Sequence, residues 1–463
     1  PTGPWRVGSG EGGALPGGPP RMTPAQALAV LRAVAEEEGV PSLARRRGWV
    51  AALSRAVMAR AAALAEAAAA DFGARSAEDT LLADVKIMAD AAAHIRWNLW
   101  RWARPRRVFA PYPFQPARAW AEWVPKGVVG VMAPWNYPVQ LALLPAMDAL
   151  AAGNRVVIKP SEHAPRVAAL LGEIVAEALG PRVALVLPGD AALAREFAAT
   201  PWDHLVFTGG TETGRKVMAA AAANLTPLTL ELGGKCPAIV LPGAELARAA
   251  KDILVAKAVN AGQTCIAPDT VLLVGHRAED FAAAARASGV AETGTRVINA
   301  AQQARLERLI AGREVEWLAP APGSLGLARS GGALAEEEIF GPVLAMEECA
   351  DLAAALAWVR ARPHPLAIYL FGATRAEEEA VAAATTSGAL VCGRAVEYAA
   401  IMALPFGGVG ASGFGRRNGE AGFREFSTLR ARVRHGRFSL SRLFDRPQGA
   451  FARRLIRRLV GLR

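Results

Sequence analysis

Residues 128–162 read VVGVMAPWNYPVQLALLPAMDALAAGNRVVIKPSE, and this stretch indicates the fold. Its two β-branched runs, VVGVM and RVVIK, enclose a loop and an apolar segment long enough for a helix. A strand, a helix and a second strand in this order form a right-handed βαβ unit with parallel strands. The runs VALVL, HLVF and AIVL continue the alternation, and a second block from about 235 to 415 repeats it. The sequence therefore predicts an α/β protein with parallel sheets.

The composition limits the classes of function. The chain has 463 residues, enough for two or three domains, and 52% of them are hydrophobic, which supports a large core. It lacks an uninterrupted apolar run of bilayer-spanning length, so no transmembrane helix is expected. The net charge of +11 comes mostly from arginines spread along the chain, without the aromatic residues that stack on bases, so nucleic-acid binding is not expected. Four cysteines in so long a chain indicate a reducing cytoplasm rather than a disulfide framework.

Local signals mark where the folded part of the chain begins. Residues 1–21 are rich in Gly and Pro and are expected to be a flexible leader that is not a secretory signal. Thr23, Pro24 and Gln26 supply an N-cap, a first-turn proline and a capping-box partner, so a helix should begin here. Gly39 should end this helix.

Polar loops follow the predicted strands, and ligands of parallel sheets bind at that end of the strands. The segments are APWNYP (133–138), KPSE (159–162), TGGTETG (208–214), ELGGK (231–235) and NAGQTC (260–265). Taken singly, each fits a structural role. A cysteine in an apolar segment is usually a core residue, a lone glutamate is more often a salt-bridge partner, and the glycine turn lacks the G-x-G-x-x-G spacing.

Taken together, these segments resemble the aldehyde dehydrogenase superfamily, whose motifs occur here in the order of the family. They are followed downstream by EEEIFGP (336–342) and LPFGGVG (404–410). The pattern is most similar to the class 3 branch and its bacterial coniferyl aldehyde dehydrogenase-like members, since DFGARS (71–76) and RPRRV (104–108) have close counterparts there. The resemblance runs from about residue 25 to 440.

The resemblance implies NAD-dependent oxidation of an aldehyde to a carboxylic acid. Cys265 is expected to be the nucleophile that forms a thiohemiacetal and, after hydride transfer, a thioester. The side-chain amide of Asn136 and the backbone N–H of Cys265 would stabilise the oxyanion, and Glu231 would be the general base for hydrolysis. The expected substrate is a coniferyl-type aromatic or a medium-to-long apolar aldehyde. A fatty or terpenoid aldehyde dehydrogenase, a thioesterase and a catalytically weakened, membrane-associated relative are the alternatives.

The same resemblance implies a dinucleotide site, with NAD expected and NADP as the alternative. Lys159 and Glu162 resemble the pair at the adenine ribose, where an unshielded carboxylate would repel a 2′-phosphate. The glycine turn would present a helix N-terminus to the pyrophosphate. Glu338 and Phe340 match residues that hold the nicotinamide ribose and ring. The expected cofactor residues are Trp135, Lys159, Ser161, Glu162, Gly209, Gly210, Thr211, Gly214, Glu338 and Phe340, and no metal is expected.

The implied fold is aldehyde dehydrogenase-like, with two doubly wound parallel-sheet domains and a small β element that bridges the subunits of a homodimer. The segments AWAEWVP (119–125) and STLRARVR (427–434) are read as the edge or bridging strands of this element. The expected parts are a leader (1–21), a dinucleotide-binding domain (22–104 and 128–230), a catalytic domain (231–414), a bridging element (105–127 and 415–440) and a tail (441–463).

Two segments depart from the family pattern, and three cysteines outside the motifs need an interpretation of their own. The Tyr-His-Gly of the family is replaced by RNG (417–419). The apolar strand that normally precedes EEIFGP is not recognisable in WLAPAPGSLGLARSGGALAEEE (317–338). Cys236, Cys349 and Cys392 are expected to be buried small residues rather than redox partners.

The C-terminal segment FARRLIRRLVGLR (451–463) is amphipathic, with apolar side chains on one arc and arginines on the other. It is too short to span a bilayer. Packing over the substrate entrance or the dimer surface is the favoured role. Peripheral contact with an anionic inner membrane surface is the alternative to a purely cytoplasmic location.

Overall fold

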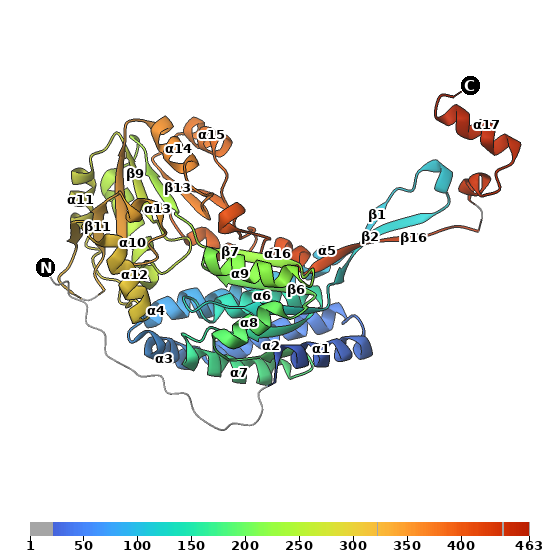
Figure 1. The fold of residues 1–463 in the computed structure, drawn as a ribbon, viewed down its shortest axis with the longest axis horizontal. Coiled ribbons are helices and arrows are strands. Elements are labelled where there is room, and N and C mark those ends of the chain that lie inside the picture. Colours follow the sequence, from blue (N-terminus) through green and yellow to red (C-terminus); the bar gives the residue numbers. More distant parts are fainter. Residues whose placement is uncertain (1–21, 322, 438, 463) are drawn as a thin grey trace.

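The computed structural model describes residues 22–321, 323–437 and 439–462, so the predicted leader at 1–21 lies outside the described residues. The described chain has an α/β fold with three sheets (Figure 1). The two large sheets form adjoining lobes of the body, and a three-stranded sheet projects from the body as an arm. Two parallel-rich sheets with a small additional β element confirm the predicted fold class.

Helices and short helical turns connect the strands along the whole described chain. They are α1 (Pro24–Glu38), α2 (Leu43–Ala59), α3 (Ala61–Phe72), α4 (Ala77–Asp79), η1 (Thr80–Lys86), α5 (Ile87–Trp102), η2 (Tyr112–Phe114), α6 (Gln140–Ala152), α7 (Pro165–Leu179), α8 (Ala191–Ala199), α9 (Thr211–Ala222), α10 (Leu246–Ala258), η3 (Val259–Gly262), α11 (Ala278–Ala287), α12 (Ala300–Ile310), α13 (Ala333–Glu336), α14 (Leu352–Arg360), α15 (Arg375–Ala384), η4 (Glu397–Ala400), η5 (Gly410–Ser412), α16 (Gly419–Glu425), η6 (Leu440–Phe444) and α17 (Ala450–Leu459).

The six-stranded sheet is doubly wound around β3. Its order is β15-β7-β6-β3-β4-β5, parallel except for β15, and its strands are β3 (Val128–Met132), β4 (Arg155–Lys159), β5 (Ala184–Val186), β6 (His204–Gly209), β7 (Leu228–Leu232) and β15 (Gly413–Phe414). Val129 and Val131 pack with α2, α5, α6 and α7, whereas Val128 and Met132 pack with α1, α8 and α9. Burial of both faces explains the unbroken apolar runs. The topological switch lies between β3 and β6, where ligands of such sheets bind.

The seven-stranded sheet has the order β10-β11-β12-β9-β8-β13-β14 and is parallel except for β10. Its strands are β8 (Pro237–Val240), β9 (Thr270–Val274), β10 (Val315–Trp317), β11 (Gly326–Arg329), β12 (Val343–Cys349), β13 (Ala367–Phe371) and β14 (Ala389–Cys392). Strand β11 corrects the expectation that 317–338 holds no recognisable strand, because it pairs in parallel with β12. This strand is difficult to recognise in the sequence because Leu327 is its one large apolar side chain. Gly326 leaves room for a methyl group of Val315 and the ring of Trp317, both in β10.

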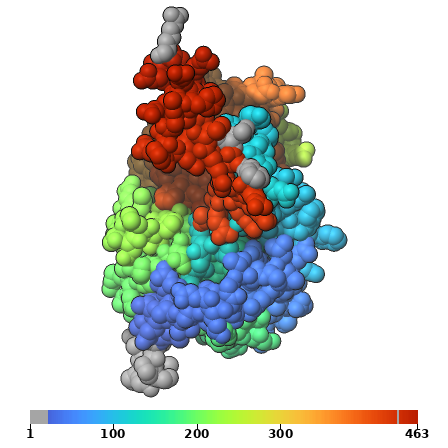
Figure 2. Space-filling model, turned by 90° about the vertical axis from the view of Figure 1, so that its right-hand side faces the viewer, coloured from blue at the N-terminus to red at the C-terminus, as the bar shows by residue number. Residues whose placement is uncertain are grey.

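The arm consists of β1 (Arg106–Val108), β2 (Arg118–Pro125) and β16 (Ser427–Arg434), all antiparallel. The segments AWAEWVP and STLRARVR are therefore strands outside the large sheets, as predicted. Helix α17 lies at the far end of the arm (Figure 1), and the C-terminal segment stands in front of the body when viewed from that side (Figure 2). Within the described ranges, no helix combines the length and apolarity needed to cross a membrane.

The predicted start of the first helix is confirmed in detail. The hydroxyl of Thr23 accepts a hydrogen bond from the backbone N–H of Gln26, and the Gln26 side chain accepts one from the backbone of Thr23. Pro24 occupies the first helical position, and Gly39 follows the last turn with a φ of 65°. This reciprocal capping satisfies N–H groups that would otherwise lack partners.

The prediction for the three additional cysteines is correct for one of them. Cys236 is buried, but Cys349 is half-buried and Cys392 is exposed. Cys392 is exposed because it ends β14, which is an edge strand of the seven-stranded sheet. All four cysteines of the chain are free thiols.

Candidate active site

Two cavities meet at Cys265. The first, of about 560 Å³, lies beyond the carboxyl ends of β6 and β7 and is lined by polar groups that include Asn136, Glu231 and Glu338. The second, of about 470 Å³, is lined mainly by apolar residues such as Leu141 and Ile266. Cys265 lines both cavities. A thiol in this position can react with a molecule in one cavity while a molecule in the other takes part in the reaction.

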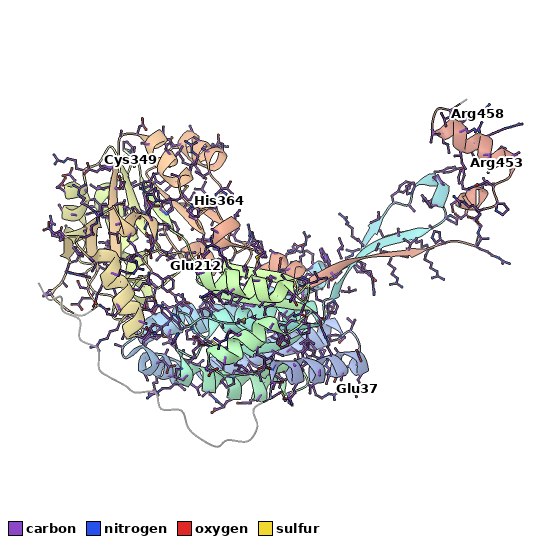
Figure 3. The ribbon with its side chains drawn as sticks, in the orientation of Figure 1. Glu37, Glu212, Cys349, His364, Arg453 and Arg458 are labelled. Carbon is purple, nitrogen blue, oxygen red and sulfur yellow. The ribbon has the colours of Figure 1, made fainter. Side chains whose placement is uncertain are left out.

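Most of the predicted site residues gather around the first cavity. Its lining includes Trp135, Asn136, Gly209, Gly210, Thr211, Glu231, Cys265, Glu338 and Phe340. The exceptions are Lys159, Ser161 and Glu162, at the end of the neighbouring strand β4, and Gly214, one turn into α9. Figure 3 shows that Glu212 and His364, which also line this cavity, lie between the two large sheets, far from Arg453 and Arg458 at the tip of the arm.

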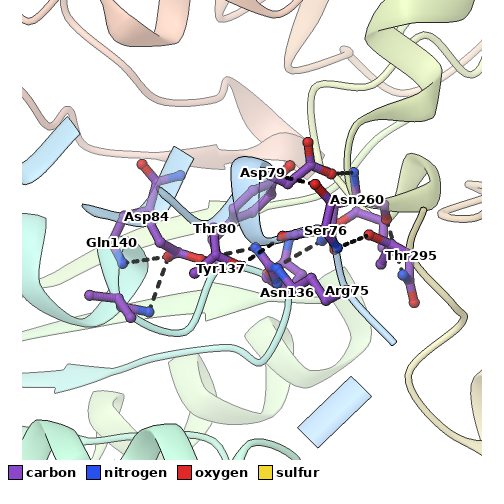
Figure 4. A network of polar contacts seen from close by, with 12 residues as sticks. Arg75, Ser76, Asp79, Thr80, Asp84, Asn136, Tyr137, Gln140, Asn260 and Thr295 are labelled. Atoms are coloured by element: carbon purple, nitrogen blue, oxygen red, sulfur yellow. Dashed lines mark hydrogen bonds and ion pairs between the residues drawn. The ribbon is translucent and has the colours of Figure 1, made fainter. Parts of the chain in front are cut away.

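A buried charge pair fixes the loop that carries Asn136 (Figure 4). The guanidinium of Arg75 lies 2.9 Å from the Asp84 carboxylate, and neither side chain is exposed to solvent. Arg75 also donates to the backbone carbonyl of Asn136 at 2.7 Å. The other Asp84 oxygen accepts from the backbone N–H groups of Val139 and Gln140, at the start of α6. The pair therefore holds the middle of the loop after β3 and the point where this loop enters α6.

The segment that leads to Cys265 is tied to the same loop. The Asn260 side chain donates to the carbonyl of Asn136 at 2.9 Å, and the Asn136 side chain donates to the carbonyl of Gln263 at 3.0 Å. Tyr137 and Thr264 share a hydrogen bond of 2.6 Å between their hydroxyls. Asn260 has a φ of 51°, in the left-handed region, which Asn tolerates better than most residues. These bonds place the amide of Asn136 and the thiol of Cys265 on one surface.

The thiol of Cys265 is protonated in this environment at neutral pH. Its pKa is raised to about 12, mainly by burial and also by the charges of Glu338 and Glu231, while the guanidinium of Arg417 opposes the rise. Cys236 lies behind this segment, where its thiol donates to the carbonyl of Cys265 at 3.4 Å. Attack by Cys265 therefore requires removal of the thiol proton.

Glu231 is paired with a residue that replaces the family pattern. It lies in β7 and is bonded to the Nε of Arg417, and each of the two side chains is only 3% exposed. The guanidinium of Arg417 also stacks on the ring of Phe406, at 5.1 Å from the ring centroid. The arginine at this position thus holds the carboxylate of Glu231 beside the first cavity.

The glycine turn and two aromatic residues shape the rest of the first cavity. Gly209 and Gly210 lead into α9, whose first residues line the cavity, so the backbone N–H groups of a helix N-terminus are available to an anion. A Cβ on Gly209 would lie 2.5 Å from the ring of Phe207. The rings of Trp135 and Phe340 meet edge to face at 5.5 Å. The two predicted aromatic cofactor residues are therefore in contact.

Glu338 reaches the first cavity from the seven-stranded lobe. Its carboxylate approaches Gly233 so closely that a Cβ there would lie 2.0 Å from Oε2. Burial raises the pKa of Glu338 to about 7, although the backbone N–H of Gly234 donates to the carboxylate. Gly233 is therefore required for the approach of the glutamate.

The residues after β4 form a separate polar group. Lys159 is buried and its ammonium group donates to Glu162 at 2.9 Å and to the carbonyl of Pro160 at 3.1 Å. Ser161 accepts from the backbone N–H of His163. Burial alone would raise the pKa of Glu162, but the hydrogen bond and charge of Lys159, together with a backbone hydrogen bond, outweigh burial and lower this pKa. Glu162 is therefore ionised and partly shielded by Lys159.

Sequence reasoning missed the residues that hold the site together. Arg75 and Asp84 were not singled out, although Arg75 lies in the DFGARS segment used for the resemblance. Asn260 was named only as part of the NAGQTC motif, and Arg417 only as a residue that departs from the family pattern. Arg75 and Asp84 are nine residues apart, whereas Asn260 lies 124 residues from Asn136 and Arg417 lies 186 residues from Glu231. Among the described residues, no group of three or more His, Cys, Asp or Glu side chains is placed to hold a metal ion.

Comparison with known proteins agrees with this arrangement. The model of the aldehyde dehydrogenase family matches residues 22–311 and 325–431. A probable coniferyl aldehyde dehydrogenase of Pseudomonas aeruginosa is 38% identical over 449 residues, which cover 92% of this chain and 94% of the relative. A 4,4'-diapolycopene-4,4'-dial dehydrogenase of Cytobacillus firmus is 33% identical over 421 residues, which cover 86% of this chain and 91% of the relative.

Among solved structures, a substrate-bound state of Staphylococcus aureus AldH superposes with a TM-score of 0.87 at 27% identity, over 94% of this chain and 99% of that chain. The share of this chain that is covered is large enough that the match extends over both large sheets. The chain therefore belongs to the aldehyde dehydrogenase family.

Proposed function

We propose that Cys265 is the nucleophile of the aldehyde oxidation, because it lines both cavities. The aldehyde occupies the apolar cavity, and the sulfur of Cys265 bonds to the carbonyl carbon as the thiol passes its proton to solvent water. The carbonyl oxygen then carries negative charge. Asn136 uses one of its two amide N–H groups on the carbonyl of Gln263, which leaves the other for this oxyanion.

The first cavity fits a dinucleotide. NAD, when bound there, accepts the hydride that leaves the carbon of the thiohemiacetal. The N-terminus of α9 is the group that would hold the pyrophosphate, with Gly209 and Gly210 allowing close approach. Trp135 and Phe340 would border the nicotinamide, and Glu338 its ribose. Hydride loss converts the adduct on Cys265 into a thioester.

Glu231 is the base that we assign to hydrolysis. It removes a proton from water, whose oxygen bonds to the thioester carbon, and the sulfur of Cys265 leaves and recovers a proton. The bond from Arg417 fixes the carboxylate of Glu231 beside the cavity that Cys265 also lines. Immobilisation of this base contributes to the rate by orientation, since the base needs no further ordering when water attacks the thioester.

For the substrate we propose a coniferyl-type aromatic aldehyde, and a terpenoid or fatty aldehyde is the second candidate. The relatives named above act on substrates of both kinds. The apolar lining of the second cavity supports an aldehyde attached to an apolar body rather than a sugar or an amino acid. The volume of about 470 Å³ is sufficient for either kind of apolar group.

We expect the purified enzyme to form NADH with coniferyl aldehyde, and replacement of Cys265 by Ala to lower kcat/KM by about a thousandfold or more. A panel of aromatic, fatty and terpenoid aldehydes ranks the substrates by kcat/KM. The formation of NADH is followed at about 340 nm, near its absorbance maximum. Cys349→Ala is the matched control, because Cys349 lines neither cavity.

Equal activity of the Cys265→Ala variant would contradict the mechanism. Hydrolysis of acyl thioesters without NAD(P), together with no NADH from any aldehyde, would instead favour the thioesterase. A wild-type protein inactive in both assays would favour a catalytically weakened relative.

We propose that NAD is preferred over NADP because the ionised carboxylate of Glu162 repels a 2′-phosphate. The Glu162→Gln variant removes this charge and leaves Lys159 as a cation. We expect the ratio of kcat/KM for NADP to that for NAD to rise about tenfold or more. Glu173→Gln, an exposed change in α7, is the control. An unchanged ratio would show that Glu162 does not select the cofactor.

We propose that the arm bridges two subunits of a homodimer in a reducing compartment such as the cytoplasm. The four free cysteines support such a compartment. Phe451 and Leu459 of α17 are 69% and 70% exposed, so the apolar side of this helix has room for a partner. No residue of α17 lines either of the two cavities that meet at Cys265, so the helix does not cover their entrance in its own chain.

We therefore expect α17 to pack on the second subunit. Deletion of 445–463 should weaken the dimer in light scattering, and the full chain should not sediment with anionic liposomes. Sedimentation of the full chain that is lost in the deletion variant, with an unchanged dimer, would support the membrane alternative instead.

A further inference from the structure

We propose that Arg417 is a carboxylate receptor in the apolar cavity, and that it binds the acid product of the reaction through its Nη1 nitrogen. The inference rests on the proposed function of Cys265 and Glu231, because it assigns the product of that reaction as the ligand. The class of ligand is a carboxylate attached to an apolar ring or chain.

The Nη1 nitrogen of Arg417 is buried, and it finds no hydrogen-bond acceptor in the part of the chain that the structure describes. The Nε of the same guanidinium is bonded to Glu231, and the whole residue is 3% exposed. In a guanidinium, Nη1 and Nε–H point in different directions, so a carboxylate on Nε cannot also satisfy Nη1. A buried donor without an acceptor is costly, and a ligand that supplies an oxygen removes this cost.

Arg417 lines the second cavity, whereas Glu231 does not. The guanidinium therefore separates the general base from the space in which the apolar part of the substrate lies. Its charge reaches the reacting sulfur, because Arg417 lowers the pKa of Cys265 against the effect of burial. The receptor and the nucleophile thus belong to one cavity.

The other charged side chains of this cavity have partners or lie in more exposed positions. Lys86 and Asp90 pair with each other at 2.7 Å and are 58% and 43% exposed. Glu397 is bonded to Arg394, which is half exposed. Asp79 accepts from the backbone N–H of Asn260 at 3.0 Å. Arg417 is therefore the cation in the cavity that is both buried and incompletely bonded.

Hydrolysis of the thioester places a carboxylate beside this guanidinium. The oxygen of water bonds to the acyl carbon, the bond from carbon to sulfur breaks, and one proton returns to the thiol. The acid that is formed loses its remaining proton at neutral pH, because carboxylic acids have pKa values well below 7. The product is then an anion with an apolar body, and a charge-assisted bond to Nη1 retains it. The aldehyde itself carries no such charge.

Calorimetric titration of the wild-type enzyme without NAD(P) tests the proposal in the absence of turnover. The probes are 4-hydroxy-3-methoxycinnamate and octanoate, each compared with its own carboxamide, which keeps the shape and lacks the charge. We expect at least one of the carboxylates to bind about tenfold or more tightly than its amide. Equal affinities in both pairs, or no binding in either, would overturn the proposal.

The variant Arg417→Lys locates the receptor, because it keeps a cation near Glu231 and removes the unpaired second nitrogen of the guanidinium. Because Nη1 is buried, the carboxylate reaches it through a small shift of the Arg417 side chain. The lysine has no second nitrogen to offer after such a shift, so we expect the preference for the carboxylate to be lost. Arg416→Lys is the matched control, since Arg416 lines neither cavity and bonds to the carbonyls of Gly408 and Gly415. A preference that persists in the Arg417→Lys variant would overturn the assignment.

The double variant Glu231→Gln, Arg417→Met serves if the lysine variant does not fold, because it removes both buried charges together. It should also bind the carboxylate and the amide equally. A wild-type protein that prefers carboxylates through Arg417 but forms no NADH would contradict the proposed function and leave the receptor intact.

Discussion

The buried ion pair of Arg75 and Asp84 is the constraint on which the site depends. Breaking a buried pair of this kind costs about 3–5 kcal/mol, because one charge is left without compensation. Here the pair also bonds to the backbone of the loop after β3 and to the first N–H groups of α6. The loop in turn bonds to the segment that carries Cys265. The position of the proposed nucleophile thus depends on Arg75 and Asp84, which line neither of the two cavities.

The electrostatics of the site follow from a second buried pair. The thiol of Cys265 is protonated at neutral pH because burial raises its pKa to about 12, so its proton must leave as the aldehyde is attacked. Glu231 is the nearby carboxylate, and its bond to Arg417 keeps it in one place. Arg417 thus pairs with the base that we propose and also lines the apolar cavity.

The sequence allowed the α/β class, the βαβ units and the arm strands to be predicted, because continuous β-branched runs and capping residues are local signals. Cys265, Asn136 and Glu231 were found through motifs, and the structure places all three around one cavity. The pairing of Arg417 with Glu231, which are 186 positions apart, has no local signal. Strand β11 was missed because a strand of small side chains owes its stability to neighbours, which the sequence alone does not identify.

Mass spectrometry of the enzyme during turnover tests the central claim most directly. The Glu231→Gln variant is mixed with NAD and coniferyl aldehyde and is then quenched in acid, which preserves a thioester. The account predicts an added acyl group on the peptide that contains Cys265, and no such addition when NAD is omitted. An unmodified Cys265 peptide, or an acyl group on Cys236 instead, would contradict the account.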